Sequence, residues 1–113
     1  MRTLAIAVLC LATPALAAET KLKGPEIQTL LADKTLAGAD AAHKSEQLFQ
    51  ASGVTYYTVD GAQSQGLWQV RGDQFCSQWP PNEHWSCYDV LVDGETVVFQ
   101  SSSGKRYAYT RGN

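Results

Sequence analysis

The feature that most constrains this sequence is a pair of cysteines on either side of a proline-containing turn. Residues 75–88 read Phe-Cys-Ser-Gln-Trp-Pro-Pro-Asn-Glu-His-Trp-Ser-Cys-Tyr. If the turn lies at residues 80–83, Cys76 comes to lie opposite Cys87 on neighbouring antiparallel strands, close enough to form a disulfide. Proline suits the turn because it cannot donate to a central ladder. The pattern predicts a disulfide-bonded β-hairpin, and two unbridged buried thiols are the alternative.

The first eighteen residues are typical of a secretory signal peptide. A short basic start precedes an apolar stretch at residues 4–11, and residues 14–18 contain an Ala-x-Ala cleavage pattern. The apolar stretch is too short for a membrane-spanning helix. Removing the leader also removes Cys10 and leaves an even pair of cysteines, which suits an oxidising compartment. We therefore expect a periplasmic or secreted location.

The remaining residues, 19–113, are few enough for a single domain. They carry eight basic and eleven acidic side chains. This weakly acidic balance argues against nucleic acid or anionic lipid as a partner. No second apolar stretch is long enough to span a bilayer, so we expect no membrane span. The oligomeric state stays open.

The periodicity of apolar residues predicts a short helix followed by antiparallel strands. Residues 24–26 (Gly-Pro-Glu) are typical of a helix start, and an apolar stripe continues to about residue 33, while residues 19–23 are expected to be loose. Glycine-containing segments at residues 60–66, 72–73 and 93–94 separate β-branched and aromatic runs. The expected strands are 47–50, 54–59, 67–71, 75–79, 85–92, 96–100 and 105–110, and residues 35–44 could form a short strand followed by a loop. The fold class is α+β, a helix before an antiparallel β-meander that forms a curled sheet or a partial barrel.

Turn positions assign the side chains to two faces of this sheet. A two-residue turn at residues 72–73 sets one register, and a turn at Asp93-Gly94 would pair Val90 with Val97. The expected apolar face contains Trp68, Val70, Phe75, Trp79, Tyr88, Val90, Val92, Val97, Phe99, Tyr107 and Tyr109. Both cysteines of the hairpin fall on the opposite, polar face, so we expect the disulfide to lie outside the main core.

The spacing of tryptophan, glycine and cysteine resembles that of a group of exported proteins. The run at residues 66–79, followed by Trp-Ser-Cys-Tyr at 85–88 and Asp-Gly at 93–94, gives the pattern G-x-W-x-V-x-G-D-x-x-C-x-x-W … C-Y. It is similar to small exported domains of Gram-negative bacteria, mostly described as domains of unknown function. The resemblance covers roughly residues 24–112. It implies a periplasmic β-rich domain and no catalytic residues.

No catalytic or metal-binding pattern is recognisable in the sequence. His43 and His84 are the two histidines, and each is expected to be solvated. No serine stands in a nucleophile-elbow sequence, and no metal-ligand spacing is present. A disulfide would leave no thiol nucleophile, and a turn explains Arg-Gly-Asp at residues 71–73 without an adhesion role. We therefore expect no enzyme activity, no cofactor and no metal.

Aromatic residues provide two candidate binding surfaces. One is the rigid, exposed tip of the hairpin, and the other is the concave face of a curled sheet that encloses an apolar cavity. The candidate residues are Trp79, His84 and Trp85 at the tip, and Tyr57, Trp68 and Tyr88 on the sheet, where Phe99 and Tyr107 would also line the cavity. The alternative for both surfaces is a plain packed core.

These observations predict a non-enzymatic periplasmic or secreted binding module. It would present an aromatic surface to a protein, a peptide or a small apolar ligand. The alternative is a structural or envelope-stress accessory protein that pairs with a partner through a sheet edge. A cavity or an exposed apolar patch would favour the first, and an uncovered edge strand would favour the second.

Overall fold

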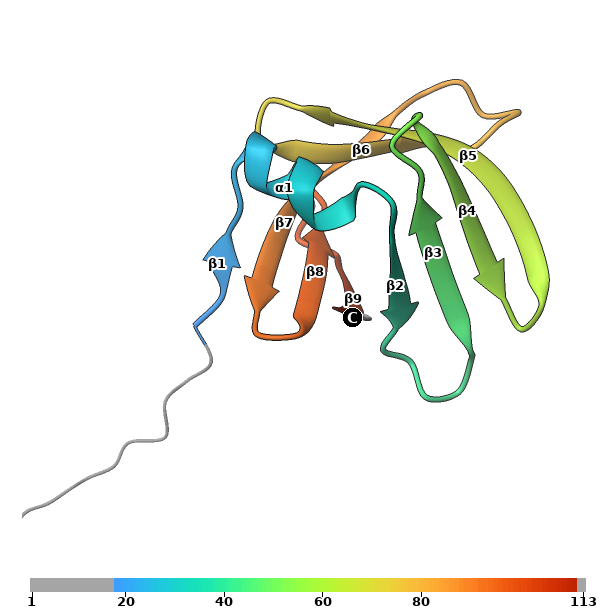
Figure 1. The fold of residues 1–113 in the computed structure, drawn as a ribbon, viewed down its shortest axis with the longest axis horizontal. Helices are drawn as coiled ribbons and strands as arrows, with labels where there is room; N and C mark the ends of the chain where they lie inside the picture. Colours follow the sequence, from blue (N-terminus) through green and yellow to red (C-terminus); the bar gives the residue numbers. More distant parts are fainter. Residues whose placement is uncertain (1–17, 112–113) are drawn as a thin grey trace, which may run out of the picture.

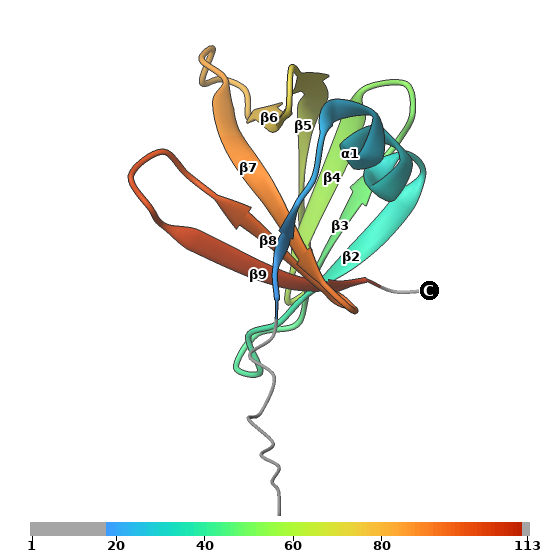
Figure 2. The ribbon, with the colours of Figure 1, turned by 90° about the vertical axis from the view of Figure 1, so that its left-hand side faces the viewer.

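The computed structural model describes residues 18–111, and these form a closed ring of eight antiparallel strands (Figures 1 and 2). Each strand from β2 to β9 pairs with the next along the chain, and β9 returns to pair with β2. The elements are β1 (Thr20–Lys21), α1 (Gly24–Leu31), β2 (Lys34–Gly38), β3 (Ser45–Phe49), β4 (Val54–Val59), β5 (Ala62–Arg71), β6 (Gln74–Gln78), β7 (Ser86–Asp93), β8 (Thr96–Gln100) and β9 (Arg106–Arg111). The expected helix followed by antiparallel strands is confirmed, and the curled sheet is a closed barrel.

The barrel has two different ends. The helix end carries α1, which contacts β2, β5 and β6. There the backbone N–H of Gly24 donates to the Asp73 carboxylate at 2.8 Å, which joins the start of α1 to the β5–β6 turn. The open end carries the longer loops at residues 39–44, 79–85 and 101–105. Figure 2 shows β8 and β9 on one side of the ring and β3 and β4 on the other.

Aromatic and aliphatic side chains fill the middle of the barrel. The buried core consists of Ile27, Leu31, Leu36, Phe49, Trp68, Phe75, Val90, Val97 and Phe99. Phe49 contacts Trp68, Phe75 and Phe99 edge-on, with ring centroids 5.7, 5.6 and 6.3 Å apart. Every residue assigned from sequence to the apolar face lies in this core, packs against it, or lines the cavity at the open end. The face assignment is therefore confirmed.

The predicted disulfide joins β6 to β7. Cys76 and Cys87 are register partners and are bonded. Their positions alternate with those of the inward-facing Phe75 and Ser77, so the disulfide lies outside the central core. The presence of this disulfide is consistent with a protein that folds in an oxidising compartment. The predicted signal peptide is residues 1–18, and all of it except Ala18 lies outside the described residues. Within residues 18–111 there is no helix with the length and apolar character needed to cross a membrane.

The β7–β8 hairpin turns one residue later than the sequence suggests. Its turn is Gly94-Glu95, so Val90 pairs with Phe99 rather than with Val97. Gly94 has φ +59°, and a turn that needs positive φ at its first central position places glycine there. The pairing changes by two residues, an even number, so every side chain keeps its predicted face.

The loop expected at residues 60–66 is instead a tight turn followed by a long strand. The chain turns at Asp60-Gly61, and β5 begins at Ala62. Position 66, inside this strand, is a glycine because the Trp79 ring packs directly over it. A Cβ at position 66 would lie 2.6 Å from that ring and 2.7 Å from the Gln78 carbonyl oxygen. This glycine provides space for an aromatic ring rather than a turn.

Residues 19–23, expected to be loose, include strand β1. Its partner is the second half of β7, where Thr20 lies opposite Val92 and the backbone N–H of Leu22 donates to the Val90 carbonyl at 2.9 Å. Strand β6 pairs with residues 86–88 of β7, and β1 continues along the same edge. The expectation failed because two paired residues produce no recognisable alternation in a sequence.

Candidate functional site

The open end of the barrel contains an aromatic cavity of about 270 Å³, here called the mouth. Its lining residues are Gln47, Tyr57, Phe75, Ser77, Trp79, Tyr88, Phe99, Tyr107 and Tyr109. Phe75 and Phe99 are stacked with ring centroids 4.6 Å apart, and both belong to the buried core. The floor of the mouth is therefore the upper surface of the packed interior.

Tyrosine rings form much of the wall of the mouth. Tyr88 packs edge-on against Tyr107 with ring centroids 5.9 Å apart, and Tyr109 lies 5.2 Å from Phe99. Burial, together with the neighbouring phenols, raises the pKa of Tyr109 to about 12. Tyr109 therefore stays protonated and uncharged at neutral pH.

Two polar side chains interrupt this aromatic wall. Gln47 and Ser77 are each 5% exposed. The Gln47 Nε2 donates to the Thr55 hydroxyl at 3.0 Å, and the Trp79 indole N–H donates to the Ser77 hydroxyl at 3.2 Å. These hydrogen bonds hold the amide, the hydroxyl and the indole in fixed orientations. An apolar wall with a few oriented polar groups is the usual composition of a small-molecule site.

A shallower depression of about 420 Å³ adjoins the mouth at its rim. Tyr57, Tyr107 and Tyr109 line both spaces. The depression adds polar groups from Asp40, Ser45 and Arg106. A ligand too long for the mouth could therefore extend over the rim without leaving the tyrosine wall.

An ion pair joins two segments at the open end. His43 Nδ1 lies 2.9 Å from an Asp60 carboxylate oxygen, and the other oxygen accepts the backbone N–H of Lys44 at 3.0 Å. The hydrogen bond and the charge of Asp60 raise the pKa of His43 above 6.5. The same hydrogen bond lowers the pKa of Asp60 below 3.8. His43 is exposed, as expected, but it has a partner.

We expect the His43–Asp60 pair to stabilise the fold within a window of pH. The raised pKa of His43 gives a contribution that is complete below pH 6.5 and is lost as the pH rises through the folded-state value. The lowered pKa of Asp60 gives a contribution present above pH 3.8 and lost as the pH falls through its folded-state value. Asp60→Asn should return the pKa of His43, measured by NMR titration, toward 6.5. An unchanged His43 pKa in this variant would contradict the pairing.

Three of the six predicted binding residues meet in the mouth. Tyr57 from β4, Tyr88 from β7 and Trp79 after β6 all line it, and the rings of Tyr57 and Trp79 lie 6.3 Å apart. Tyr107, which was expected to line an apolar cavity, lines the mouth as well, and Tyr109 was assigned to the same face without being named as a binding residue. Closure of β9 onto β2 brings them into the wall, and no short-range sequence signal reports that closure.

The other three predicted residues lie elsewhere. Trp68 is 4% exposed in the core, where its indole N–H donates to the Gln50 carbonyl at 2.7 Å. The side chain of Trp85 packs against the Arg71 guanidinium, 5.2 Å from the ring centroid. His84 is exposed on the hairpin loop. The hairpin tip and the concave sheet are thus separate surfaces, and Trp79 is the tip residue that joins the mouth.

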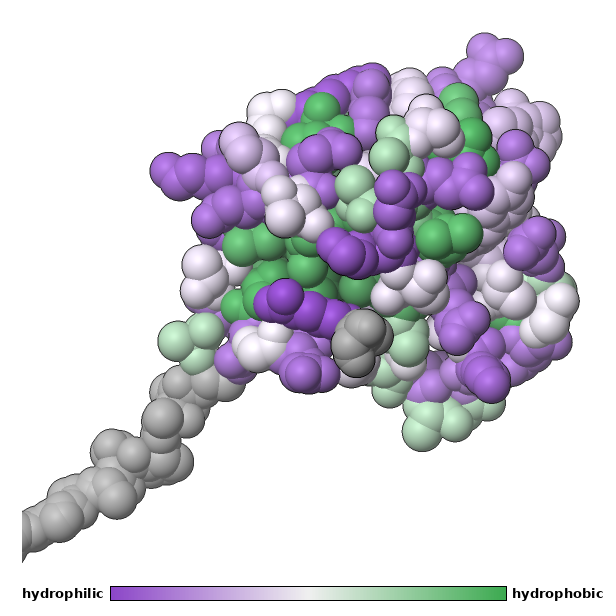
Figure 3. Space-filling model, in the orientation of Figure 1, coloured by the Kyte–Doolittle hydropathy of each residue, from purple (hydrophilic) through white to green (hydrophobic). Residues whose placement is uncertain are grey.

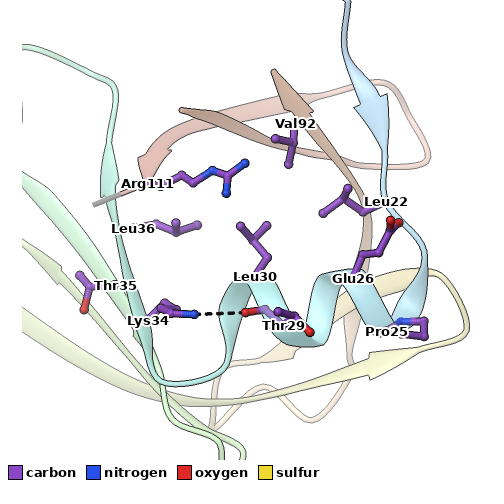
Figure 4. Close-up of a pocket in the computed structure, with 10 residues that line it drawn as sticks. All are labelled: Leu22, Pro25, Glu26, Thr29, Leu30, Lys34, Thr35, Leu36, Val92 and Arg111. Carbon is purple, nitrogen blue, oxygen red and sulfur yellow. Dashed lines mark hydrogen bonds between the residues drawn. The ribbon is translucent and has the colours of Figure 1, made fainter. Parts of the chain in front are cut away.

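The helix end holds a second, larger cavity of about 680 Å³, here called the helix-end pocket. Its lining residues are Leu22, Pro25, Glu26, Thr29, Leu30, Lys34, Thr35, Leu36, Val92 and Arg111 (Figure 4). Figure 3 shows an apolar hollow with polar residues around it on this face of the molecule. The pocket was not predicted, because its wall combines a helix, the link from β1 to that helix, and three separate strands, β2, β7 and β9.

Comparison with known proteins adds no assignment to these cavities: no family model, curated protein or solved structure matches the chain. The resemblance to exported domains of Gram-negative bacteria therefore stays a prediction. Among residues 18–111, no group of three or more histidine, cysteine, aspartate or glutamate side chains is arranged to hold a metal ion.

Proposed function

We propose that this protein binds a small, predominantly apolar molecule in the mouth of its barrel and does not convert it chemically. The observation that supports this proposal best is the mouth itself, a cavity with an aromatic wall at the open end of a closed ring of strands. The fold itself does not require such a cavity, because side chains can fill the interior of a small barrel completely.

Preorganisation of the wall favours binding. Phe75 and Phe99 are fixed from below by Phe49, and the indole of Trp79 is fixed by its hydrogen bond to Ser77. A wall that is already ordered loses little conformational entropy when a ligand enters. The barrel therefore acts as a rigid receptor in this proposal.

The mouth also limits the class of ligand. Its volume of about 270 Å³ lies near the lower bound of small-molecule pockets, so a compact molecule with one or two rings fits best. Tyr109 is uncharged, and the negative faces of the aromatic rings give an anionic ligand little compensation for lost hydration. Gln47 and Ser77 offer hydrogen-bonding groups, which suits a neutral ring that carries a hydroxyl or carbonyl group.

The alternative of pairing through a sheet edge has less support. Within residues 18–111, every strand of the ring pairs with a neighbour on each side, and the free edges described here are short: β1 has two residues, and residues 62–66 of β5 pair with β4 alone. So short an edge offers few hydrogen bonds to a partner. Export to the periplasm or the medium belongs to our proposal, and the disulfide supports it.

Adjacent tyrosines on β4 provide a matched test. Tyr57 lines the mouth, and Tyr56 faces the outer surface because side chains alternate along a strand. We expect naphthol, a neutral two-ring alcohol, to bind the wild type in isothermal titration calorimetry. Tyr57→Ala should weaken this binding by about tenfold or more, the cost of losing one aromatic contact, whereas Tyr56→Ala should leave it unchanged.

The same experiment includes a check on folding and an outcome against the proposal. Circular dichroism will show whether each variant is folded, and Tyr107→Ala is a second mouth variant at a side chain that is already 39% exposed. Equal effects of Tyr57→Ala and Tyr56→Ala, or no saturable binding of naphthol to the wild type, would contradict a site in the mouth.

A further inference from the structure

Two cations occupy inward-facing positions at the helix end of the barrel. On β9, Tyr107 and Tyr109 face the interior, and Arg111 is the next residue on that face. On β2, Leu36 is buried in the core, and Lys34 lies two residues before it on the same face. Both side chains are exposed at this rim of the barrel, where a ligand can reach them. Both cations line the helix-end pocket.

Hydrogen bonds hold both cations at the wall of the pocket. Lys34 Nζ donates to the Thr29 carbonyl at 3.2 Å, and Arg111 Nε donates to the Gly94 carbonyl at 3.2 Å. An ammonium has three donors and a guanidinium has five, so each group keeps further donors for a ligand. Figure 4 shows the guanidinium of Arg111 pointing into the pocket between Leu30 and Val92.

An aliphatic wall lies between the two cations and the acidic residue of the pocket. Leu22, Leu30 and Val92 provide aliphatic surface between the cations and the opposite side of the pocket. Glu26 lies on that opposite side, where its carboxylate accepts the backbone N–H of Lys23 at 2.8 Å. The acid is thus engaged at the start of α1, and Figure 4 shows it away from Arg111.

We infer that the helix-end pocket binds an amphipathic carboxylate, with its carboxylate at Arg111 and Lys34 and its alkyl chain along the aliphatic wall. A guanidinium matches a carboxylate through two parallel hydrogen bonds, and the neighbouring ammonium adds a further donor. The volume of about 680 Å³ falls within the usual range of small-molecule sites. This site is separate from the mouth, because the packed core lies between the two ends of the barrel.

A pair of probes that differ only in the headgroup tests this inference. Decanoate and decanol have the same alkyl chain, so their difference in affinity reports recognition of the carboxylate. We expect decanoate to bind the full exported chain at least about tenfold more tightly than decanol in calorimetric titrations. Arg111→Gln should remove this advantage and leave decanol binding unchanged, and Lys34→Gln should reduce it in part.

Two further variants locate the binding of decanoate. Lys44→Gln removes an exposed cation from a loop at the open end and should leave both affinities unchanged. Tyr57→Ala alters the mouth and should likewise leave decanoate binding unchanged.

Equal affinities for decanoate and decanol, or an Arg111→Gln variant that binds decanoate as the wild type does, would overturn the inference. So would loss of decanoate binding in Tyr57→Ala, because it would place the ligand in the mouth. Naphthol binding is a separate readout, so failure of the helix-end site and failure of the mouth are distinguishable.

Discussion

Replacing Phe49 with alanine should destabilise the protein by about 3–5 kcal/mol, the usual cost of removing a buried aromatic ring. Phe49 is fully buried and contacts the rings of Trp68, Phe75 and Phe99. The surrounding strands are joined in a closed ring, so they have little freedom to collapse into the space. Denaturant unfolding followed by tryptophan fluorescence measures this loss.

Leu67→Ala is the matched control for this measurement. Leu67 lies on β5 and is 39% exposed, so its truncation should change the free energy of unfolding by less than about 1 kcal/mol. If Phe49→Ala cost no more than Leu67→Ala, the central role of Phe49 in the core would be wrong. Phe75 and Phe99 form the floor of the mouth, so Phe49→Ala should also weaken naphthol binding.

Removing the disulfide should cost about 3 kcal/mol. The cysteines are 11 residues apart, and in the chain-entropy model a loop of similar length restricts the unfolded chain by roughly that amount. The variant carries Cys76→Ala together with Cys87→Ala, because alanine leaves no buried thiol. Its free energy of unfolding should be lower than that of the oxidised wild type.

Reductant provides the internal control for the disulfide. Dithiothreitol should lower the stability of the wild type toward that of the double variant and leave the double variant unchanged. A wild type that is equally stable in both redox states would show that the bond does not contribute to folding. Trp79 follows the end of β6, the strand that carries Cys76, so the variant also tests whether the bond positions the mouth.

Local patterns in the sequence were sufficient for most strands of the ring and for the face that each side chain takes, although β1 and the first half of β5 were missed. The Gly72-Asp73 turn sets the register of β5 with β6, and the turn placed at residues 80–83 sets the pairing of Cys76 with Cys87. The shifted turn at Gly94 leaves the face assignment correct, since a change of two residues in the β7–β8 pairing preserves the alternation of side chains. These features depend on neighbours a few residues apart, and periodicity reports such neighbours directly.

Closure of the ring and the positions of the cavities could not be inferred in the same way. The pairing of β2 with β9 joins segments about seventy residues apart, and each strand looks the same whether a sheet is open or closed. Tyr57, Trp79 and Tyr88 were named as binding residues from their chemistry. Closure of the ring of strands brings these three side chains together in the mouth and encloses Trp68 in the core. Arg111 was not named at all, because its inward direction follows from the register of the last strand.

The seam between β2 and β9 contains three residue pairs, from Leu36–Arg111 to Gly38–Tyr109. All other joints of the ring connect consecutive strands, whose short loops lose less entropy on closing, so we expect the hairpins to form early and the seam to form last. Both cavities span this seam, through Tyr109 in the mouth and through Leu36 and Arg111 in the helix-end pocket. Both binding sites are therefore complete only when the seam has formed, at the final step of folding. A ligand that binds at either end would stabilise the closed ring by mass action.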